Sequence, residues 1–364
     1  MKKALKDICS MIHRGKTPKY VEESDVLVFA QKCNLQKGGI DLNKCLCLDT
    51  TNLKKWTTED YLHKNDIVIN STGTGTLGRV GFFDIDSEKP VVPDTHVTVV
   101  RVSDKETYSK WVYYFLKYSQ NYLISKGHGS TKQQELATSE IKKIEIPLPS
   151  YAYQENGAHH LDSIQSAIDN KKQQFQQLDE LVKSKFVEMF GDPITNSKNF
   201  PTKKVIDVVT LQRGYDLPIQ DRDSTGSIPV YGSNGQLGTH SISKIDKGIV
   251  TGRSGTIGEV HLCNEPFWPL NTTLFSNNTH GNNLIYLKYL LDFFDLKRFK
   301  SGVGVPTLNR NEFHDEQIID VDFELQTTFA EYVQKIDSAK SIIKTQLADL
   351  QELLDSKMDE YFGE

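Results

Sequence analysis

The sequence predicts an α+β protein composed of two copies of one unit, each an α/β lobe followed by a long helix. The segments "LDELVKSKFVEMFG" (178–191) and "LQELLDSKMDEYFG" (350–363) share eight of 14 positions, and "GTLGRV" (75–80) matches "GTIGEV" (255–260). Self-similarity along most of a chain indicates a duplicated architecture. The expected parts are a first lobe at 1–150, a central helix at 151–193, a second lobe at 194–322 and a C-terminal helix at 323–364.

A glycine-rich segment in the first lobe, "STGTGTLGRVGF" (71–82), contains a literal G-x-G-x-x-G formed by Gly73, Gly75 and Gly78. A dinucleotide-binding fingerprint requires a strand before these glycines and a helix after them. Here β-prone residues lie on both sides, and both copies keep only G-T-[Leu/Ile]-G-x-V. We therefore expect a β-hairpin with glycines in its turn, and no cofactor.

Each copy ends in an apolar heptad pattern about 30 residues long, which is typical of paired helices. Lys171 and Lys185 interrupt the pattern in the first helix. Because each helix has one obvious partner of equal length, we expect the two to pack along one another. The alternative is an amphipathic helix that lies on its own lobe. The a and d positions are Leu161, Ile164, Ile168, Phe175, Leu178, Val182 and Met189 in the first helix, and Val333, Ile336, Ile343, Leu347, Leu350, Leu354 and Tyr361 in the second.

The charge of the 364-residue chain is unevenly distributed. The formal net charge is −5, yet residues 323–364 alone contain nine Asp or Glu and four Lys or Arg. Acidic residues are thus concentrated in the helical segments, and the total does not exclude nucleic-acid binding by the lobes. The chain has no apolar run of 18 residues and no signal-peptide pattern, so we expect a cytoplasmic protein without membrane contact.

The five cysteines have no spacing typical of a disulfide framework, which fits a reducing compartment. Cys33, Cys45 and Cys47 resemble half of a zinc site, but no matching pair follows, so free thiols are expected. His159 and His160 lack the spacing of metal ligands. No bound metal is therefore predicted.

Motifs for catalysis are missing. The sequence contains no G-K-[Ser/Thr] phosphate-binding loop and no Asn/Asp-Pro-Pro-aromatic tetrapeptide for methyl transfer to a base. Pro93-Asp94 with Glu140-x-Lys142 imitates a metal-dependent nuclease core, but the spacing is long and Leu270 replaces the aspartate in the second copy. We expect no catalytic residues and no cofactor.

Polar loops recur at matching places in the two copies and carry the side chains that bind phosphates and base edges. Surface loops are often polar without binding anything. Recurrence in two diverged copies favours a binding role over this simpler interpretation. The predicted DNA-binding residues are Arg14, Lys16, Thr72, Thr74, Arg79, Ser130, Lys132 and Gln133 in the first lobe, and Arg213, Tyr215, Asn234, Arg253, Lys300, Asn309 and Arg310 in the second.

The helix-end motif "LDELVKSKFVEMFGDP", the "GTIG" hairpin, "IPVYGSNGQLG" and "QRG" resemble the specificity subunit of type I restriction-modification enzymes. The resemblance covers essentially the whole chain. It implies two target recognition domains that each bind one half of a split DNA site. It also implies an antiparallel coiled coil that sets their spacing and docks two methyltransferase subunits, which restriction subunits join in the full complex.

The resemblance further implies that this subunit is not itself catalytic. The segment "PVYGSNGQLG" occurs only in the second lobe, and the first has "VFAQKCNL" near that place, so the lobes are expected to recognise different sequences. Two alternatives stay open. One is a specificity-like DNA-binding or nuclease module outside a type I complex, and the other is a two-lobed scaffold or adhesin that does not bind DNA.

Overall fold

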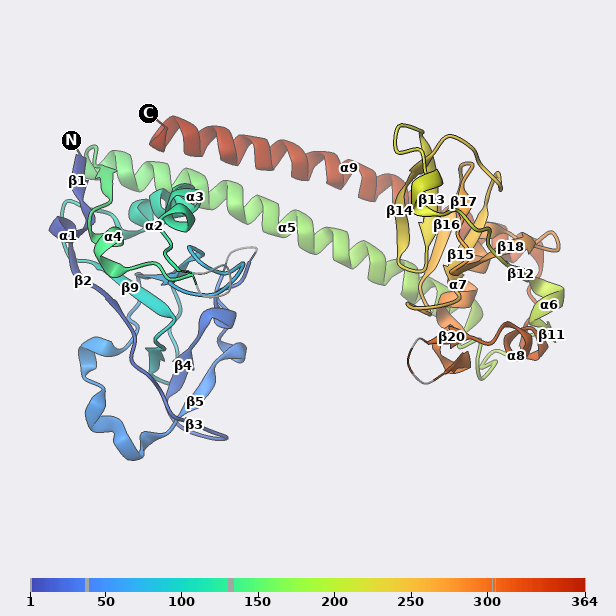
Figure 1. Cartoon of the computed structure of the whole chain (residues 1–364), viewed down its shortest axis with the longest axis horizontal. Helices are drawn as coiled ribbons and strands as arrows, with labels where there is room; N and C mark the ends of the chain where they lie inside the picture. The colour runs from blue at the N-terminus through green and yellow to red at the C-terminus, as the bar shows by residue number, and fades with distance from the viewer. Residues whose placement is uncertain (1, 37–38, 130–133, 303, 305, 364) are drawn as a thin grey trace. The chain divides into compact units, whose positions relative to one another are not determined.

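The computed structural model describes residues 2–36, 39–129, 134–302, 304 and 306–363. The chain divides into two compact units (Figure 1). Unit 1 comprises Met1–Asn170 and Leu347–Glu364, and unit 2 comprises Lys171–Gln346. Each unit therefore contains one lobe and a part of each long helix.

The lobe of unit 1 is built on a four-stranded antiparallel sheet of order β2-β9-β6-β7. A second sheet has the order β3-β5-β4-β8, and β1 pairs with β10. The strands are β1 Lys2–Ala4, β2 Cys9–Arg14, β3 Tyr20–Val21, β4 Leu27–Phe29, β5 Leu46–Leu48, β6 Asp66–Asn70, β7 Val80–Phe83, β8 Val91–Pro93, β9 Val97–Val102 and β10 Glu145–Pro147.

Helix α2 packs on the main sheet of unit 1, because its apolar residues Trp111 and Val112 share one buried cluster with Ile67 and Ile69 of β6. The helices of this lobe are α1 Leu5–Ile8, α2 Ser109–Tyr118, α3 Gln120–Ser125 and α4 Thr138–Lys142, with 3₁₀ turns η1 Gln31–Cys33, η2 Leu42–Lys44, η3 Thr50–Lys55 and η4 Thr58–Asp60.

The lobe of unit 2 repeats this plan, with a main antiparallel sheet of order β12-β18-β15-β16 and a smaller sheet of order β14-β13-β17. Strand β11 pairs with β21, as β1 does with β10. The strands are β11 Thr202–Lys204, β12 Thr210–Arg213, β13 Ile228–Gly232, β14 Gly235–His240, β15 Gly248–Gly252, β16 Val260–Cys263, β17 Trp268–Pro269, β18 Thr273–Asn278, β19 Lys300–Ser301, β20 Thr307–Leu308 and β21 Gln317–Ile319.

Helix α7 of unit 2 takes the place of α2, and its Tyr286 and Leu287 lie in one cluster with Ile249 of β15. The remaining elements are α6 Val205–Val208, α7 Leu284–Phe293, α8 Arg310–Asp315 and the turns η5 Ile219–Asp221 and η6 Leu296–Phe299. The two lobes thus share one α+β plan, which confirms the predicted duplication and fold class.

The glycine-rich segments form hairpin turns in both lobes. Strand β6 returns as β7 with Ile69 opposite Val80, and β15 returns as β16 with Thr251 opposite Val260. Gly78 and Gly258 have φ angles of 75° and 103°, a region that favours glycine. The chain passes from strand to strand and not from strand to helix, so this is not a dinucleotide-binding turn.

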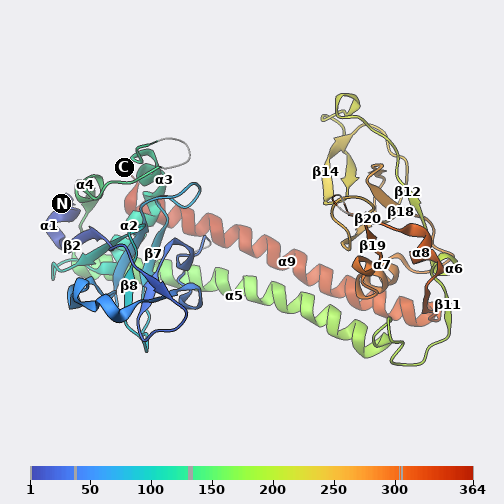
Figure 2. The same cartoon turned by 60° about the horizontal axis from the view of Figure 1, so that its bottom comes forward.

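The two long helices are α5, Tyr151–Phe190, and α9, Phe323–Phe362, and they lie side by side in both views of unit 2 (Figures 1 and 2). In unit 2, Phe186 of α5 contacts Phe329 of α9 with ring centroids 5.6 Å apart, and Asp179 binds Lys340 at 2.5 Å. From the first contact to the second, the residue number decreases from 186 to 179 on α5 and increases from 329 to 340 on α9. The two helices are therefore antiparallel in unit 2.

In unit 1 the first turns of α5 pack against the last turns of α9. His160 Nδ1 lies 3.0 Å from the Tyr361 hydroxyl, and Leu161 and Leu354 are buried in one cluster. All the predicted a and d residues are buried or half-buried. The seam in unit 2 also includes Phe186, Phe190 and Phe329, which the heptad pattern omits. Phe186 and Phe190 contact Tyr286 of the lobe as well.

Candidate functional site

One end of the main sheet in unit 2 gathers most of the cationic residues predicted for that lobe. Strand β12 ends at Arg213, which is opposite Leu274 near the start of β18. Strand β15 ends at Gly252, opposite Thr273, and is followed by Arg253. Because the neighbouring strands are antiparallel, these two arginines lie at the same end of the sheet.

A third segment closes this end of the sheet. Ser254 forms a bridge with Thr307, and the Leu308 amide donates to the Arg253 carbonyl at 2.8 Å. This brings Asn309 and Arg310, at the start of α8, beside the two arginines. Together they border a cleft of about 340 Å³, here called the arginine cleft. It is lined by Arg213, Arg253, Leu274, Ser301, Thr307, Leu308, Asn309, Arg310 and Asn311.

The arginine cleft is cationic. Among the described residues that line it, three are arginines and none is acidic. Arg213 is half exposed and binds Asp216 at 3.1 Å on one side, while Arg253 donates from Nε to the Asn271 carbonyl at 3.0 Å. No ion pair is found for the Arg310 guanidinium within the described part of the chain. Guanidinium groups bind phosphate and guanine through paired donors, so this cleft suits an anionic, polar ligand.

Arg310 also influences a neighbouring histidine. His314, on the same helix, is 8% exposed and accepts a hydrogen bond from the Leu211 amide at 3.1 Å through Nε2. Burial first, and the Arg310 charge second, lower the pKa of His314 below its usual value. The imidazole is therefore held in its neutral form, and the positive charge of the region resides on the arginines.

The other predicted residues of unit 2 lie outside the arginine cleft. Lys300 is exposed on β19 and precedes Ser301, which lines the cleft. Asn234 is exposed in the turn between β13 and β14. Tyr215 packs on Phe275 with ring centroids 5.7 Å apart and is half-buried, which makes it a core residue as well as a candidate contact.

The corresponding end of the unit 1 sheet has different chemistry. Leu136 donates to the Ser71 carbonyl as Leu308 does to that of Arg253, and α4 begins after Ala137 as α8 begins after Asn309. Ser71 thus replaces Arg253. By the same register Ala137 replaces Asn309 and Thr138 replaces Arg310. The unit 1 counterpart keeps one arginine of the three.

That remaining arginine, Arg14, makes hydrogen bonds to other residues of its own lobe. It donates from Nη1 to Glu135 at 2.6 Å and from Nη2 to the Leu136 carbonyl at 2.8 Å. Its Nε atom is buried without a hydrogen-bond partner in the described part of the lobe. The guanidinium joins the end of β2 to the segment before α4, and its charge is partly neutralised by the Glu135 carboxylate.

Two further cations of unit 1 make internal contacts. Lys16 binds Asp60 at 2.6 Å, and this ammonium with two Thr57 hydrogen bonds lowers the pKa of Asp60 despite burial. Arg79 donates from Nη1 to the Asn34 carbonyl at 2.7 Å. Both side chains remain half-buried, so a DNA contact would use their remaining donors.

The threonines of unit 1 lie on the β6–β7 turn. Thr74 is exposed, and the Thr72 hydroxyl lies 2.7 Å from His96 Nδ1 and accepts from Gln31 Nε2 at 2.6 Å. Ser130, Lys132 and Gln133 lie outside the described residues. The role of each predicted DNA-binding residue in both lobes stays a prediction.

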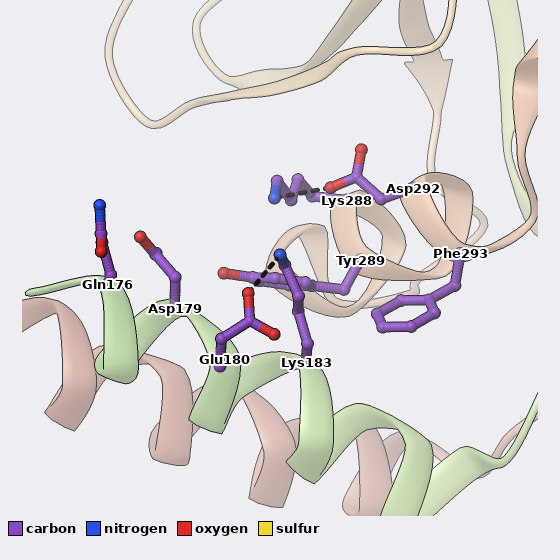
Figure 3. A pocket seen from close by; sticks show the side chains of 8 residues that line it. All are labelled: Gln176, Asp179, Glu180, Lys183, Lys288, Tyr289, Asp292 and Phe293. Carbon is purple, nitrogen blue, oxygen red and sulfur yellow. Dashed lines mark hydrogen bonds and ion pairs between the residues drawn. The ribbon is translucent and has the colours of Figure 1, made fainter. Parts of the chain in front are cut away.

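A second cleft in unit 2, of about 430 Å³, lies between α5 and α7 (Figure 3). Its charged side chains pair with one another: Lys183 binds Glu180 at 2.8 Å, and Lys288 binds Asp292 at 2.7 Å. Burial raises the pKa of Asp292. Because each lysine here already has a carboxylate, this cleft offers much less free charge than the arginine cleft.

The residues of the nuclease-like pattern do not form a metal-binding cluster in the part of the chain that the structure describes. Glu140 of the nuclease-like pattern binds Lys143 at 2.9 Å, and Asp94 is 3% exposed. Within the described ranges, no group of three His, Cys, Asp or Glu side chains is placed to hold a metal ion. Nor does any helix of the described chain have the length and apolar character needed to span a membrane.

Sequence reasoning missed Asn311, Ser301 and Thr307 of the arginine cleft, and the Glu135 carboxylate that neutralises Arg14. Asn311 directly follows two predicted residues in "TLNRN", so extending that motif by one position finds it. Thr307 and Glu135 become recognisable only when the two lobes are aligned by their bridges, because the loops before them differ in sequence.

A family model described as the type I restriction modification DNA specificity domain matches residues 1–180 and 197–352. The chain belongs to this family. The two matches correspond to the two copies found by internal repeat, so the resemblance noted from the helix-end motif is confirmed. Each copy of the specificity domain contains one lobe, and the arginine cleft belongs to the second copy.

Solved structures support the same fold for this specificity-domain protein. The crystal structure of a type I restriction-modification S subunit from M. genitalium is 18% identical, with a TM-score of 0.64, and the match covers 100% of this chain and 96% of that one. A structure from work on complex assembly and conformational transition of the type I R-M system is 12% identical, with a TM-score of 0.56 and coverage of 100% and 97%. A comparison with curated protein sequences finds no match.

Proposed function

We propose that this chain is the DNA sequence-specificity subunit of a type I restriction-modification complex, and that each lobe binds one half of a bipartite site. The arginine cleft is the observation that carries the proposal. Three arginines at one sheet end, with Asn309 and Asn311 beside them, provide donors for phosphates and guanine and amide groups for adenine. A protein of this family with such a surface has the means to bind DNA specifically.

The long helices are proposed to dock two methyltransferase subunits, and the restriction subunits join these in the full complex. Leu181 and Val187 of α5 are exposed in unit 2, and so is Ile342 of α9. Exposed apolar residues on helices rich in acidic residues favour a protein partner over DNA, because phosphates repel carboxylates. The catalytic residues for methylation are then supplied by those partners in the cytoplasm.

The proposal is tested by co-expressing the chain with its methyltransferase subunits and mapping methylated adenines in the host genome. We expect one bipartite motif with the wild-type chain. The double variant Arg253→Ala, Arg310→Ala should lose or relax one half-site. Lys247→Ala is the matched control, because this exposed lysine precedes β15 and lies at the opposite end of the sheet. Absence of site-specific methylation with the wild-type chain would contradict the function, as would methylation or cleavage by the purified chain alone.

A further inference from the structure

Two cysteines of unit 1 that are 12 positions apart in sequence lie in contact. The Sγ atoms of Cys33 and Cys45 are 3.4 Å apart. Cys33 ends the turn η1 and is fully buried, whereas Cys45 follows η2 and is half-buried. The Asp41 amide donates to the Cys33 carbonyl at 2.9 Å, so the two turns are held together by the backbone as well.

We propose that Cys33 and Cys45 form a redox modification site, which a hydroperoxide converts to an intramolecular disulfide. One S–S bond forms and the O–O bond of the peroxide breaks. The two thiols lose their hydrogen atoms and are oxidised, and the peroxide is reduced to water and an alcohol, or to two waters for hydrogen peroxide. The sulfur atoms need to approach by about 1.4 Å to reach disulfide bonding distance.

The surroundings favour reaction at this pair over reaction at Cys9 or Cys263. The thiol hydrogen bond from Cys45 lowers the pKa of Cys33, and the thiolate is the reactive form of cysteine. Burial raises the pKa of Cys9 and of Cys263 to about 12. Those two thiols therefore stay protonated and react slowly.

A metal site at these cysteines is disfavoured. Cys47 is the third cysteine in this segment, but the described residues contain no cluster of three potential ligands around it. Structural zinc sites use four ligands. Two thiols in contact without a third ligand fit disulfide formation better than metal binding.

The residues on either side of Cys33 support the β6–β7 turn. Gln31 Nε2 donates to the Thr72 carbonyl at 2.6 Å, and Asn34 Nδ2 donates to the Arg79 carbonyl at 3.1 Å. Arg79 in turn donates to the Asn34 carbonyl at 2.7 Å. Movement of Cys33 toward Cys45 displaces these supports. If the lobe binds DNA as proposed above, oxidation weakens binding at the half-site of unit 1 and leaves that of unit 2 unchanged.

The modification is tested first without DNA, in the full-length variant Cys9→Ser, Cys47→Ser, Cys263→Ser, which keeps only the proposed pair. After treatment with hydrogen peroxide, the intact mass should fall by two hydrogen atoms, and trypsin should release residues 33–37 linked to residues 45–54. Dithiothreitol should reverse both changes. Cys33→Ser and Cys45→Ser in the same background are the controls. Two thiols that still react with maleimide after peroxide treatment would overturn the proposal.

The coupling to DNA is a separate measurement on the reduced and oxidised wild-type complex. We expect affinity for the full target to fall about tenfold on oxidation, the size of one lost base contact, and to recover with dithiothreitol. A disulfide with unchanged affinity would overturn the coupling but not the modification site. Absence of specific binding by the reduced complex would instead contradict the proposed function.

Discussion

Arg253 and Ser71 occupy equivalent positions in the two lobes, since the carbonyl of each accepts from the leucine amide that precedes α8 or α4. This difference, together with that between Arg310 and Thr138, makes one sheet end cationic and leaves the other near neutral. At the residue scale, therefore, the two copies of one fold present different chemistry. We expect them to recognise different half-sites for this reason.

Arg253→Ala and Arg310→Ala should each weaken DNA binding by about 1–3 kcal/mol if the arginine reads a base, and should relax one position of the site. If the arginine binds a phosphate instead, the salt dependence of log K should fall by about one unit without a change in sequence preference. Binding titrations over a range of salt concentrations distinguish the two. Unchanged affinity and salt slope in both variants would contradict the role assigned to the arginine cleft.

The lowered pKa of His314 predicts that the stability of the protein depends on pH. Its pKa is lower in the folded protein than the ordinary value, so the unfolded chain binds protons more readily. The contribution of neutral His314 to the free energy of unfolding should be fully present above the unfolded pKa of about 6.5 and should be lost as pH falls through the lower folded pKa. His314→Gln keeps an acceptor for the Leu211 amide, and we expect it to flatten this dependence in urea titrations.

The effect of the Arg310 charge on the pKa of His314 can be tested separately. Removing it in Arg310→Ala should raise the pKa of His314 in an NMR titration, because the nearby positive charge no longer opposes protonation. The Lys247→Ala control should leave that pKa unchanged. A pKa that stays the same in Arg310→Ala would show that the Arg310 charge does not contribute to it.

At the scale of elements, the duplicated hairpins and helices follow from the sequence because their signals are local. A turn such as Gly252–Gly258 needs glycine, since a Cβ at Gly252 would collide with the Thr256 carbonyl. The apolar heptads likewise identify the seam of α5 and α9. The arginine cleft was not predictable as a unit, because a bridge between Ser254 and Thr307, 53 positions apart, joins the ends of β12 and β15 to the segment before α8.

If the paired helices set the distance between half-sites, lengthening both should change the gap. Four residues inserted after Gln173 and after Thr345, both exposed, add about 6 Å to the pair. Since DNA rises about 3.4 Å per base pair, the spacer of the methylated motif should grow by one or two base pairs. A one-residue insertion at each point is the control, because it turns the apolar seam by about 100° and should impair assembly. An unchanged spacer, or altered half-site bases, would contradict the proposed spacing role.

At the scale of the whole molecule, each family match contains a lobe with its own sheets, turns and buried cluster. Such lobes are expected to fold and bind independently. The distribution of charge is consistent with DNA binding by the lobes and partner docking by the helices. Cationic residues gather at a sheet end in unit 2, and acidic residues are concentrated on the helices. The central claim is that each lobe recognises one half of a bipartite site.

The most direct measurement replaces residues 194–322 with the corresponding lobe of another family member, co-expresses the chimera with the methyltransferase subunits and maps methylated adenines in the host genome. We predict that one half-site changes to that of the donor lobe, while the other half-site and the spacer stay as in the wild type. A chimera that methylates normally but with both half-sites altered, or with neither altered, would contradict the claim.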